Sequence, residues 1–385
     1  MNTPRSRSLL ALSTAALALP GIASADAPPV QNTLSYKISN YKEDDLSRSE
    51  VLFGDRGRYD IDVHQFQLIA PVGRNYALQI DANYEALSGA SPWYTSQGLD
   101  GKPIVNLSGA SGIRDRRLEV SIGGSYYLDN GRIGGNIGYS KEDDYRATYI
   151  GVNGERHYNN DLTTIALGLS YSDDEIFPTD ALLFNRVINE DKSSASAFLS
   201  VSQIINAVTT FQSAVSITEQ SGFLSDPYKL RDIRPDNKTQ IAWSNSFRHF
   251  FVGADAAWHI NYRYYHDDFG ISSNTFDMAW HQNLGRDFKI VPTLRYYSQS
   301  AADFFTNIDN FLTSTSQYQS SDYRLSAFGA YSGALSFIAG LGDWTATLTA
   351  ERYIANEKYS AFQVNQPSTA LVKYNRISLG FDYSF

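Results

Sequence analysis

The stretch of sequence that decides the fold is residues 371–385, LVKYNRISLGFDYSF. In its second part an apolar set alternates with a small or polar set: Ile377, Leu379, Phe381, Tyr383 and Phe385 against Arg376, Ser378, Gly380, Asp382 and Ser384. Because successive side chains of a β-strand point to opposite faces, the first set forms an apolar wall and the second a polar one. The stretch therefore predicts a membrane-spanning strand whose apolar wall faces lipid.

The aromatic end of this stretch adds a second signal. Phe385, with Phe381 and Tyr383 before it, resembles the C-terminal signal that the barrel-assembly machinery of Gram-negative bacteria recognises. We therefore expect that machinery as a partner and outer-membrane lipid as the surroundings. An ordinary amphipathic strand is the alternative, because each strand of a barrel gives only a weak signal.

The beginning of the chain predicts export. Arg5 and Arg7 precede an apolar run at residues 9–19, and the small residues Ala-Ser-Ala follow at 23–25. This is the pattern of a secretory signal peptide. We expect residues 1–25 to be cleaved and residues 26–385 to form a single outer-membrane β-barrel domain. No later stretch reaches the roughly 18 apolar residues of a membrane-spanning helix, which excludes a helical inner-membrane protein.

The composition agrees with a barrel and excludes several other classes. The chain is 42% hydrophobic and 14% aromatic, yet its mean hydropathy is −0.33. Only every second strand residue of a barrel meets lipid, so a polar average is expected. The chain has no cysteine, which excludes disulfides and Cys-ligated metals, and we expect no cofactor. The net charge of −9 argues against a nucleic-acid partner.

Alternation recurs along the whole mature chain, without a linker that would divide it. We expect strands at residues 34–43, 58–70, 76–85, 115–127, 132–142, 144–153, 161–171, 193–203, 209–219, 238–248, 254–265, 272–283, 288–298, 323–340, 344–353 and 371–385. The prediction is an all-β, antiparallel, up-and-down transmembrane barrel of about 16 strands, with 14 or 18 as alternatives.

The connections support this count. Short ones, such as 71–75, 128–131 and 341–343, alternate with long ones, such as 86–114 and 299–322. Bacterial barrels have an even number of strands, short periplasmic turns and longer outer loops. Two connections depart from the pattern, because 140–144 must be a tight outer hairpin and 153–160 a long inner turn. A soluble β-sandwich also alternates, but it explains neither the terminal Phe nor the loop asymmetry.

Several loop and strand motifs are characteristic in combination. They are Ser-Gly-Ala-Ser-Pro-Trp-Tyr at 88–94, Ser-Asp-Pro-Tyr-Lys at 225–229, Tyr-Arg-Tyr-Tyr at 262–265 with Phe-Gly at 269–270, the run at 295–305 and Ser-Ala-Phe-Gly at 326–329. Together they resemble an uncharacterised proteobacterial family of predicted outer-membrane proteins, a family defined by a domain of unknown function. The resemblance covers essentially the whole mature chain. It implies an outer-membrane barrel and no activity.

A pore or transport channel of unidentified substrate is the function that this fold predicts first. A barrel of sixteen strands is wide enough for an aqueous lumen unless loops plug it. The candidate lumen-lining residues are Asp60, Asp62, His64, Asp81, Glu85, Arg117, Glu119, Asp255, His259, Arg263, Lys289, Arg295, Arg376 and Asp382. Acidic residues on early strands and basic residues on later ones would create a transverse field across the lumen. Alternatively, these charges pair between strands and fill the wall.

Two other functions remain open. The runner-up is a structural or assembly barrel without an open pore, whose outer loops contact a periplasmic or surface protein partner. A surface hydrolase is a weaker alternative, because it needs a nucleophile or activated water beside an oriented base. His266, Asp267 and Asp268 on an outer turn are the nearest approach to such a group. We therefore predict no catalytic residues and no metal ligands.

Overall fold

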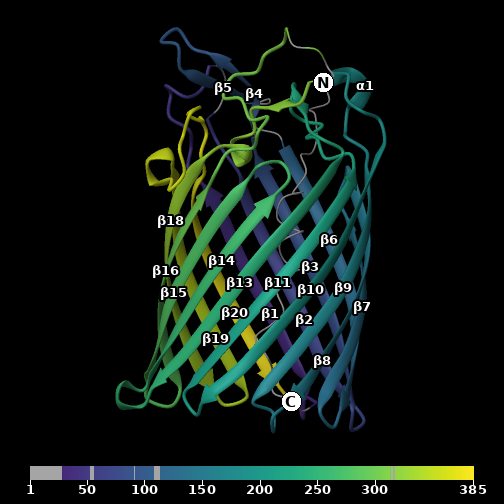
Figure 1. Cartoon of the computed structure of the whole chain (residues 1–385), viewed down its shortest axis with the longest axis vertical. Coiled ribbons are helices and arrows are strands. Elements are labelled where there is room, and N and C mark those ends of the chain that lie inside the picture. Colours follow the sequence, from purple (N-terminus) through teal and green to yellow (C-terminus); the bar gives the residue numbers. More distant parts are fainter. Residues whose placement is uncertain (1–27, 53–55, 91, 108–112, 313, 315–316) are drawn as a thin grey trace.

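The computed structural model describes residues 28–52, 56–90, 92–107, 113–312, 314 and 317–385. The expected signal peptide at residues 1–25 lies outside the described residues. Sixteen strands form one closed barrel (Figure 1). They are β1 (Thr33–Glu43), β2 (Asp60–Val72), β3 (Tyr76–Gly89), β6 (Ile113–Leu128), β7 (Gly131–Lys141), β8 (Tyr145–Tyr158), β9 (Thr163–Ile176), β10 (Glu190–Asn206), β11 (Thr209–Gly222), β13 (Asn237–Phe251), β14 (Ala256–Asp267), β15 (Ser272–Leu284), β16 (Phe288–Gln299), β18 (Phe328–Leu341), β19 (Trp344–Asn356) and β20 (Lys373–Ser384).

Each strand pairs antiparallel with its neighbours in chain order, and β1 pairs with β20 to close the barrel. The predicted fold class and the count of sixteen strands are confirmed, and every predicted strand overlaps an observed one. Several strand ends differ from the prediction by up to five residues. The strand expected from residue 323 begins at Phe328, because Tyr323–Leu325 forms a 3-10 helix, η2, that Asp322 caps.

Short turns gather at the end of the barrel where the chain terminates, and long connections gather at the other end (Figure 1). The expected tight hairpin holds only residues 142–144, and β8 extends to Tyr158, which leaves a short inner turn. By the rule for bacterial barrels, the short turns are periplasmic.

The small elements lie among the long outer connections. They are β4 (Pro92–Gln97) paired with β5 (Pro103–Leu107), α1 (Ala181–Phe184), β12 (Asp232–Ile233) paired with β17 (Gln319–Ser320), and η3 (Glu357–Tyr359). No helix in the described part of the chain is long and apolar enough to cross a membrane.

The outer wall of the barrel is apolar. Ile122, Ile137 and Ile150 lie opposite one another on β6, β7 and β8, and each is more than half exposed. Aromatic side chains stack near the periplasmic ends of the strands, as in the pair Trp344 and Tyr383, whose ring centroids are 4.5 Å apart. An apolar band flanked by aromatic residues is the surface that a bilayer requires.

The inner wall contains two close pairs of glycine and an aromatic residue. Gly138 on β7 lies directly opposite Tyr149 on β8, and Gly168 on β9 lies directly opposite Phe198 on β10. A Cβ atom at Gly138 would lie 2.1 Å from the Tyr149 ring, and one at Gly168 would lie 2.3 Å from the Phe198 ring. Because glycine has no side chain, both rings can lie against the barrel wall, and the lumen stays open beside them.

Candidate functional site

The lumen contains a cavity of about 630 Å³ beneath the outer loops. Strands β6 to β16 form its wall, and residues of the β11–β13 and β16–β18 connections, among them Asp226 and Arg324, close it from outside. Cavities of this size accommodate small solutes. This part of the lumen is the candidate functional site.

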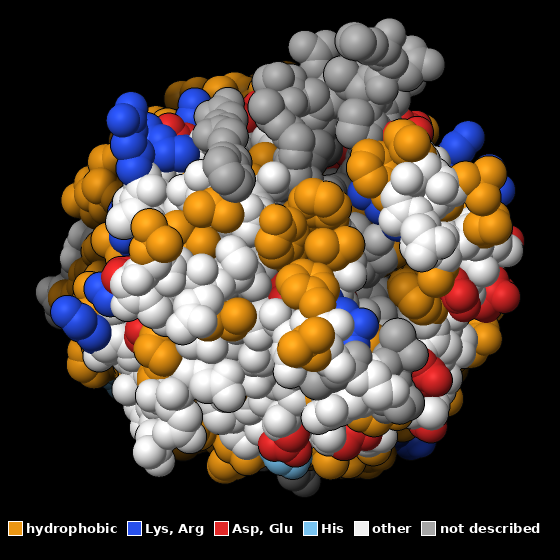
Figure 2. All heavy atoms as spheres, turned by 90° about the horizontal axis from the view of Figure 1, so that it is seen from above, with side chains coloured by type: hydrophobic (Ala, Val, Ile, Leu, Met, Phe, Trp, Pro, Cys, Tyr) orange, Lys and Arg blue, Asp and Glu red, His pale blue; other side chains and the backbone are white. Residues whose placement is uncertain are grey.

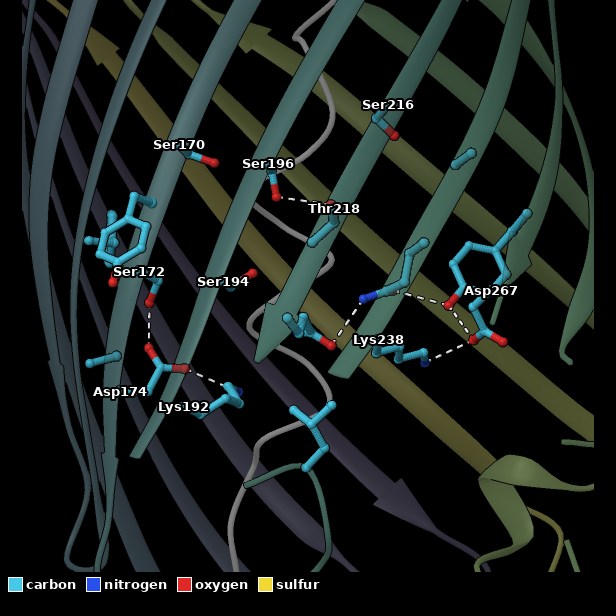
Figure 3. A pocket seen from close by; sticks show the side chains of 18 of the residues that line it. Ser170, Ser172, Asp174, Lys192, Ser194, Ser196, Ser216, Thr218, Lys238 and Asp267 are labelled. Carbon is cyan, nitrogen blue, oxygen red and sulfur yellow. Dashed lines mark hydrogen bonds and ion pairs between the residues drawn. The ribbon is translucent and has the colours of Figure 1, made fainter. Parts of the chain in front are cut away.

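One side of the cavity is a wall of hydroxyl groups. Ser170 and Ser172 on β9, Ser194 and Ser196 on β10, and Ser216 and Thr218 on β11 line the cavity (Figure 3). The hydroxyls of Ser196 and Thr218 are 2.9 Å apart and share a hydrogen bond. Small hydroxyl side chains occupy little space and both donate and accept hydrogen bonds. This wall therefore suits water and other hydroxylated solutes.

The charged groups beside the hydroxyl wall are paired. Lys192 Nζ is 3.0 Å from Asp174, and Lys238 Nζ is 2.8 Å from Asp267 (Figure 3). The Tyr265 hydroxyl also donates to Asp267, at 2.7 Å. Each lysine neutralises one carboxylate, so this side of the cavity carries polar groups without a net charge.

On the adjacent wall, the single guanidinium of Arg117 contacts several acidic groups. Arg117 contacts Glu119 at 2.5 Å and Glu85 at 3.5 Å, and its Nε donates to Ser140 at 2.9 Å. The Tyr149 hydroxyl donates to Glu119 at 2.7 Å. Arg117 thus fixes β3, β6 and β7 together and leaves an excess of negative charge.

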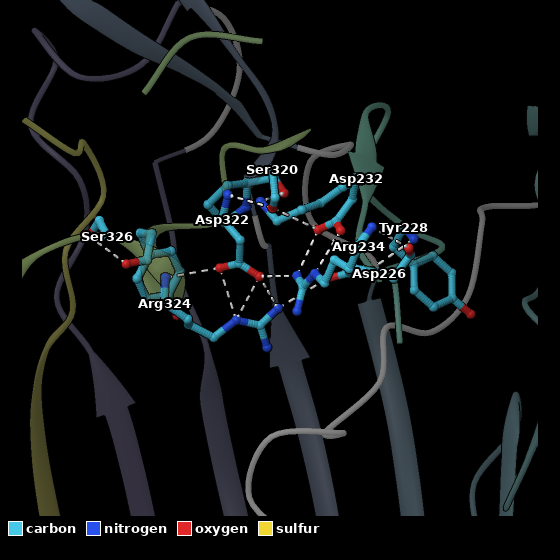
Figure 4. Close-up of polar contacts among 12 residues, drawn as sticks. Asp226, Tyr228, Asp232, Arg234, Ser320, Asp322, Arg324 and Ser326 are labelled. Atoms are coloured by element: carbon cyan, nitrogen blue, oxygen red, sulfur yellow. Dashed lines mark hydrogen bonds and ion pairs between the residues drawn. The ribbon is translucent and has the colours of Figure 1, made fainter. Parts of the chain in front are cut away.

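A buried ion-pair network, here called the latch, holds the loops over the cavity (Figure 4). It consists of Asp226, Asp232 and Arg234 from the β11–β13 connection and Asp322 and Arg324 from the β16–β18 connection. Asp322 is fully buried and accepts from both arginines, with Arg234 at 2.9 Å. Burial raises the pKa of Asp322, but the guanidiniums of Arg324 and Arg234 outweigh it and hold this pKa well below its usual range.

Apolar packing supports the latch. Phe269 and Ile271 next to β14 and β15 pack with Ala302, Phe305 and Leu325 of the β16–β18 connection, and all five are buried. Leu325 and Arg324 also line the cavity. Viewed from the outer end, loop side chains, many of them hydrophobic, cover much of the barrel mouth (Figure 2). These loops therefore restrict the outer entrance to the lumen.

Ten of the predicted lining residues face the interior. They are Asp81, Glu85, Arg117, Glu119, His259, Arg263, Lys289, Arg295, Arg376 and Asp382, as the strand registers show. Several of them pair with neighbouring strands. Arg376 Nη2 is 2.6 Å from Glu351 Oε2, and Arg295 forms an ion pair with Asp277. The ring centroids of His259 and His281 are 3.8 Å apart.

Four of the predicted lining residues do not face the interior, and those assignments were wrong. Asp60, Asp62 and His64 on β2 share the outward face with Phe66, which is 48% exposed. The alternate set on this strand turns inward because Ile61 packs there against Leu87, and both are buried. Asp255 follows the short 3-10 helix η1 (Val252–Ala254) with φ 47° and lies in a periplasmic turn, where it accepts a hydrogen bond from Asn283.

The inward charges that remain form two opposing walls. On β3 and β6 three carboxylates, Asp81, Glu85 and Glu119, and one cation, Arg117, face the lumen, an excess of two negative charges. On β13 to β16 five cations, Lys238, Arg248, Arg263, Lys289 and Arg295, face two carboxylates, Asp267 and Asp277, an excess of three positive charges. β3 and β6 are third and fourth in the barrel order and β14 and β15 eleventh and twelfth, so the two walls lie diametrically opposite.

The trio His266, Asp267 and Asp268 does not form a convergent group. His266 is on the outward face of β14 and contacts Ser272, whereas Asp267 is buried inside the barrel and pairs with Lys238. Alternation along the strand separates the two side chains.

At the C-terminal end of the chain, after β20, the backbone of Phe385 exchanges hydrogen bonds with Asn32, at 2.9 and 3.0 Å.

Sequence reasoning missed the hydroxyl wall and the latch. A signal for the wall was present, since serine and threonine recur at every second position of residues 170–172, 194–196 and 216–218. The latch had no such signal, because Asp226 and Arg324 are 98 residues apart.

The solved structures that resemble this chain are barrels. CdiB from Acinetobacter baumannii is 7% identical, with a TM-score of 0.51 over 93% of this chain and 60% of that chain. A structure titled bacterial polysaccharide outer membrane secretin is 10% identical, with a TM-score of 0.50 over 93% of this chain and all of that chain. The siderophore receptor PirA from Pseudomonas aeruginosa is 11% identical, with a TM-score of 0.44 over 85% of this chain and 56% of that chain.

The chain therefore spans less than two thirds of the length of PirA and of CdiB. The likeness to CdiB and the secretin shows an outer-membrane-type barrel fold. No curated protein matches the chain. A family model covers residues 9–369, and the chain belongs to the family described as "Protein of unknown function (DUF3570)".

Proposed function

We propose that this protein is an outer-membrane channel for small polar solutes without net charge. The observation that carries the proposal is the cavity of about 630 Å³ with a hydroxyl wall and paired lysines beneath a loop cap. A structural barrel needs no such chamber, and its core would be filled by packed side chains. Under this proposal residues 1–25 are the export signal and the rest is one barrel domain.

The opposing walls refine the proposal. Two excess negative charges on β3 and β6 face three excess positive charges on β13 to β16 across the lumen. Low-dielectric walls focus such a field across a narrow passage. A solute with separated positive and negative groups is oriented by this field at no net electrostatic cost, whereas a simple ion is drawn to one wall. Zwitterionic and strongly dipolar solutes therefore fit the passage best.

The first test is single-channel conductance of the folded protein in a planar bilayer. Stable open steps are expected. Asp81 and Lys289 are the residues to neutralise, because neither makes an ion pair among the described residues. A unit charge about 8 Å from a passing ion contributes on the order of 0.5 kcal/mol in water, or about twofold in relative permeability.

The two variants should change selectivity in opposite directions. Asp81→Asn should raise the permeability of chloride relative to potassium about twofold, and Lys289→Gln should lower it by a similar factor. A barrel that is folded but does not conduct would contradict the channel. Conductance with equal selectivity in all three proteins would contradict the transverse field only.

A closed barrel that presents its loops to a protein partner is the second candidate. The latch and the apolar cluster of Phe269, Phe305 and Leu325 favour it, because they close the outer mouth. The same bilayer experiment separates the two functions. Absence of conductance in a folded protein would direct attention to the outer loops and to a periplasmic or surface partner.

A further inference from the structure

Three carboxylates meet beside the cavity at the outer rim. Asp115 is near the start of β6, and Glu142 and Asp144 belong to the hairpin between β7 and β8. One oxygen from each lies within 4.8 Å of the other two. The three residues are only 1%, 5% and 2% exposed. Like charges this close and this buried repel strongly, so something must neutralise them.

The protein's own side chains neutralise the three carboxylates only in part. Oδ2 of Asp115 and Oε2 of Glu142 are buried and have no hydrogen-bond partner. The nearest cation, Arg117, has its Nε 3.9 Å from Glu142 but is shared with Glu85 and Glu119. Buried carboxylate oxygens without a partner are rare in native structures and indicate a missing proton, water or ion.

We propose that Asp115, Glu142 and Asp144 bind a calcium ion at the outer rim of the barrel. Calcium is bound by carboxylate oxygens at about 2.3–2.6 Å, so two of its ligands lie up to about 5 Å apart. The three oxygens of the cluster lie within 4.8 Å of one another, inside that limit. Magnesium binds at about 2.0–2.1 Å and would need the oxygens closer together. Water or main-chain oxygens would complete the coordination.

The cation would brace the wall of the cavity. The Tyr228 hydroxyl, from the β11–β13 connection, donates to Asp144, and the Asp144 carbonyl accepts from Phe177 N at 2.9 Å. Asp226 of the latch is two residues from Tyr228 and lines the cavity. An ion at this point therefore fixes β6, the β7–β8 hairpin and two loops together. The site does not depend on whether the barrel conducts.

The competing explanation is a cluster that keeps its protons. Burial, together with the carboxylates of Asp115 and Asp144, raises the pKa of Glu142 to about 8. A proton on Glu142 would remove one charge at neutral pH. Calcium binding and protonation then compete for the same oxygens.

The test is a terbium titration of the full-length protein in detergent, with terbium emission excited through nearby tyrosines and displaced by calcium. We expect a calcium Kd on the order of 0.1–1 mM, as for other extracellular calcium sites. Glu142→Gln should weaken terbium and calcium binding at least tenfold. Asp143→Asn is the matched control, because Asp143 is an exposed carboxylate in the same hairpin, and it should change affinity less than twofold.

Heat-modifiable gel mobility shows whether each variant is folded. If Glu142→Gln does not fold, the wild-type titrations with calcium and magnesium decide, and calcium should bind at least tenfold more tightly. The proposal is overturned if folded wild-type protein binds no calcium up to about 10 mM at pH 8. Equal affinity in wild type, Glu142→Gln and Asp143→Asn would also overturn it.

Discussion

At the scale of single residues, Asp322 has the most consequential position. It is fully buried at the point where two loops cross the lumen and accepts from Arg234 and Arg324. Breaking a buried ion pair by removing one charge is costly, because the remaining charges stay buried without their partner. The closure of the outer mouth therefore depends strongly on one carboxylate.

We predict that Asp322→Asn loosens the cap. The cost should be about 3 kcal/mol, and amide hydrogen exchange of residues 317–327 should accelerate accordingly. Asp100→Asn is the control, because Asp100 is an exposed carboxylate of the β4–β5 hairpin. Unchanged exchange in the Asp322 variant would mean that apolar packing alone holds the loops.

The acid response of the latch has a definite sign. The folded-state pKa of Asp322 lies below the ordinary value of 3.8, so its contribution is present above the unfolded-state pKa. This stabilisation is lost only when the pH falls through the lower, folded-state value. Burial raises the pKa of Asp232 in the same network, which works in the opposite direction. The exchange rates of wild-type residues 317–327, corrected for the intrinsic pH dependence, should therefore not increase as the pH falls from 7 to about 4.

At the scale of elements, alternation predicted every strand of the barrel but not always its faces, and it did not predict the small strands β4, β5, β12 and β17 of the outer connections. On β2 polar and apolar residues occur in both sets, and the inward set is apolar where Ile61 packs against Leu87. Alternation specifies a face only when one side is uniformly polar, as on β6 and β14. The loops were beyond prediction, because their contacts join residues far apart in the chain and follow no period.

The glycines of the inner wall provide a test at this scale. Gly138→Ala would place a methyl group 2.1 Å from the Tyr149 ring, which must then move away and lose its hydrogen bond to Glu119. We expect a loss of about 1–3 kcal/mol, because an overpacked site forces neighbouring side chains from their preferred rotamers. The urea midpoint of unfolding from lipid vesicles measures it.

Gly124→Ala is the matched control on the neighbouring strand β6. A Cβ atom there lies 3.9 Å from its nearest neighbour, the Ala77 carbonyl oxygen, which is ordinary contact. Its unfolding midpoint should stay within error of wild type. A stable Gly138→Ala variant with Tyr149 still bonded to Glu119 would contradict the steric argument.

At the scale of the whole molecule, the apolar outer wall requires lipid. Ile150 lies near the middle of β8 and is 54% exposed between Ile137 and Tyr171. Ile150→Arg should cost about 2–4 kcal/mol, because a charged side chain is placed at mid-membrane depth. Its amount in outer-membrane fractions should fall accordingly.

The control for this substitution is Leu182→Arg. Leu182 is 87% exposed, but it belongs to α1 in an outer loop. The side chain at this position therefore contacts water whether it is leucine or arginine. Its membrane level should equal that of wild type. If both arginine variants accumulate equally, the outer wall of the barrel does not contact lipid.

The seam of the barrel, where β1 meets β20, determines the order of assembly. Thr33 pairs with Ser384 and Glu43 with Tyr374, so more than 300 residues must be in place before the two strands join. Closing a loop of that length costs about 5 kcal/mol of chain entropy. Until then the growing sheet has two unpaired edges, which attract other chains. Joining β1 to β20 is therefore the slow and vulnerable step of biogenesis, and the same step removes the last aggregation-prone edge.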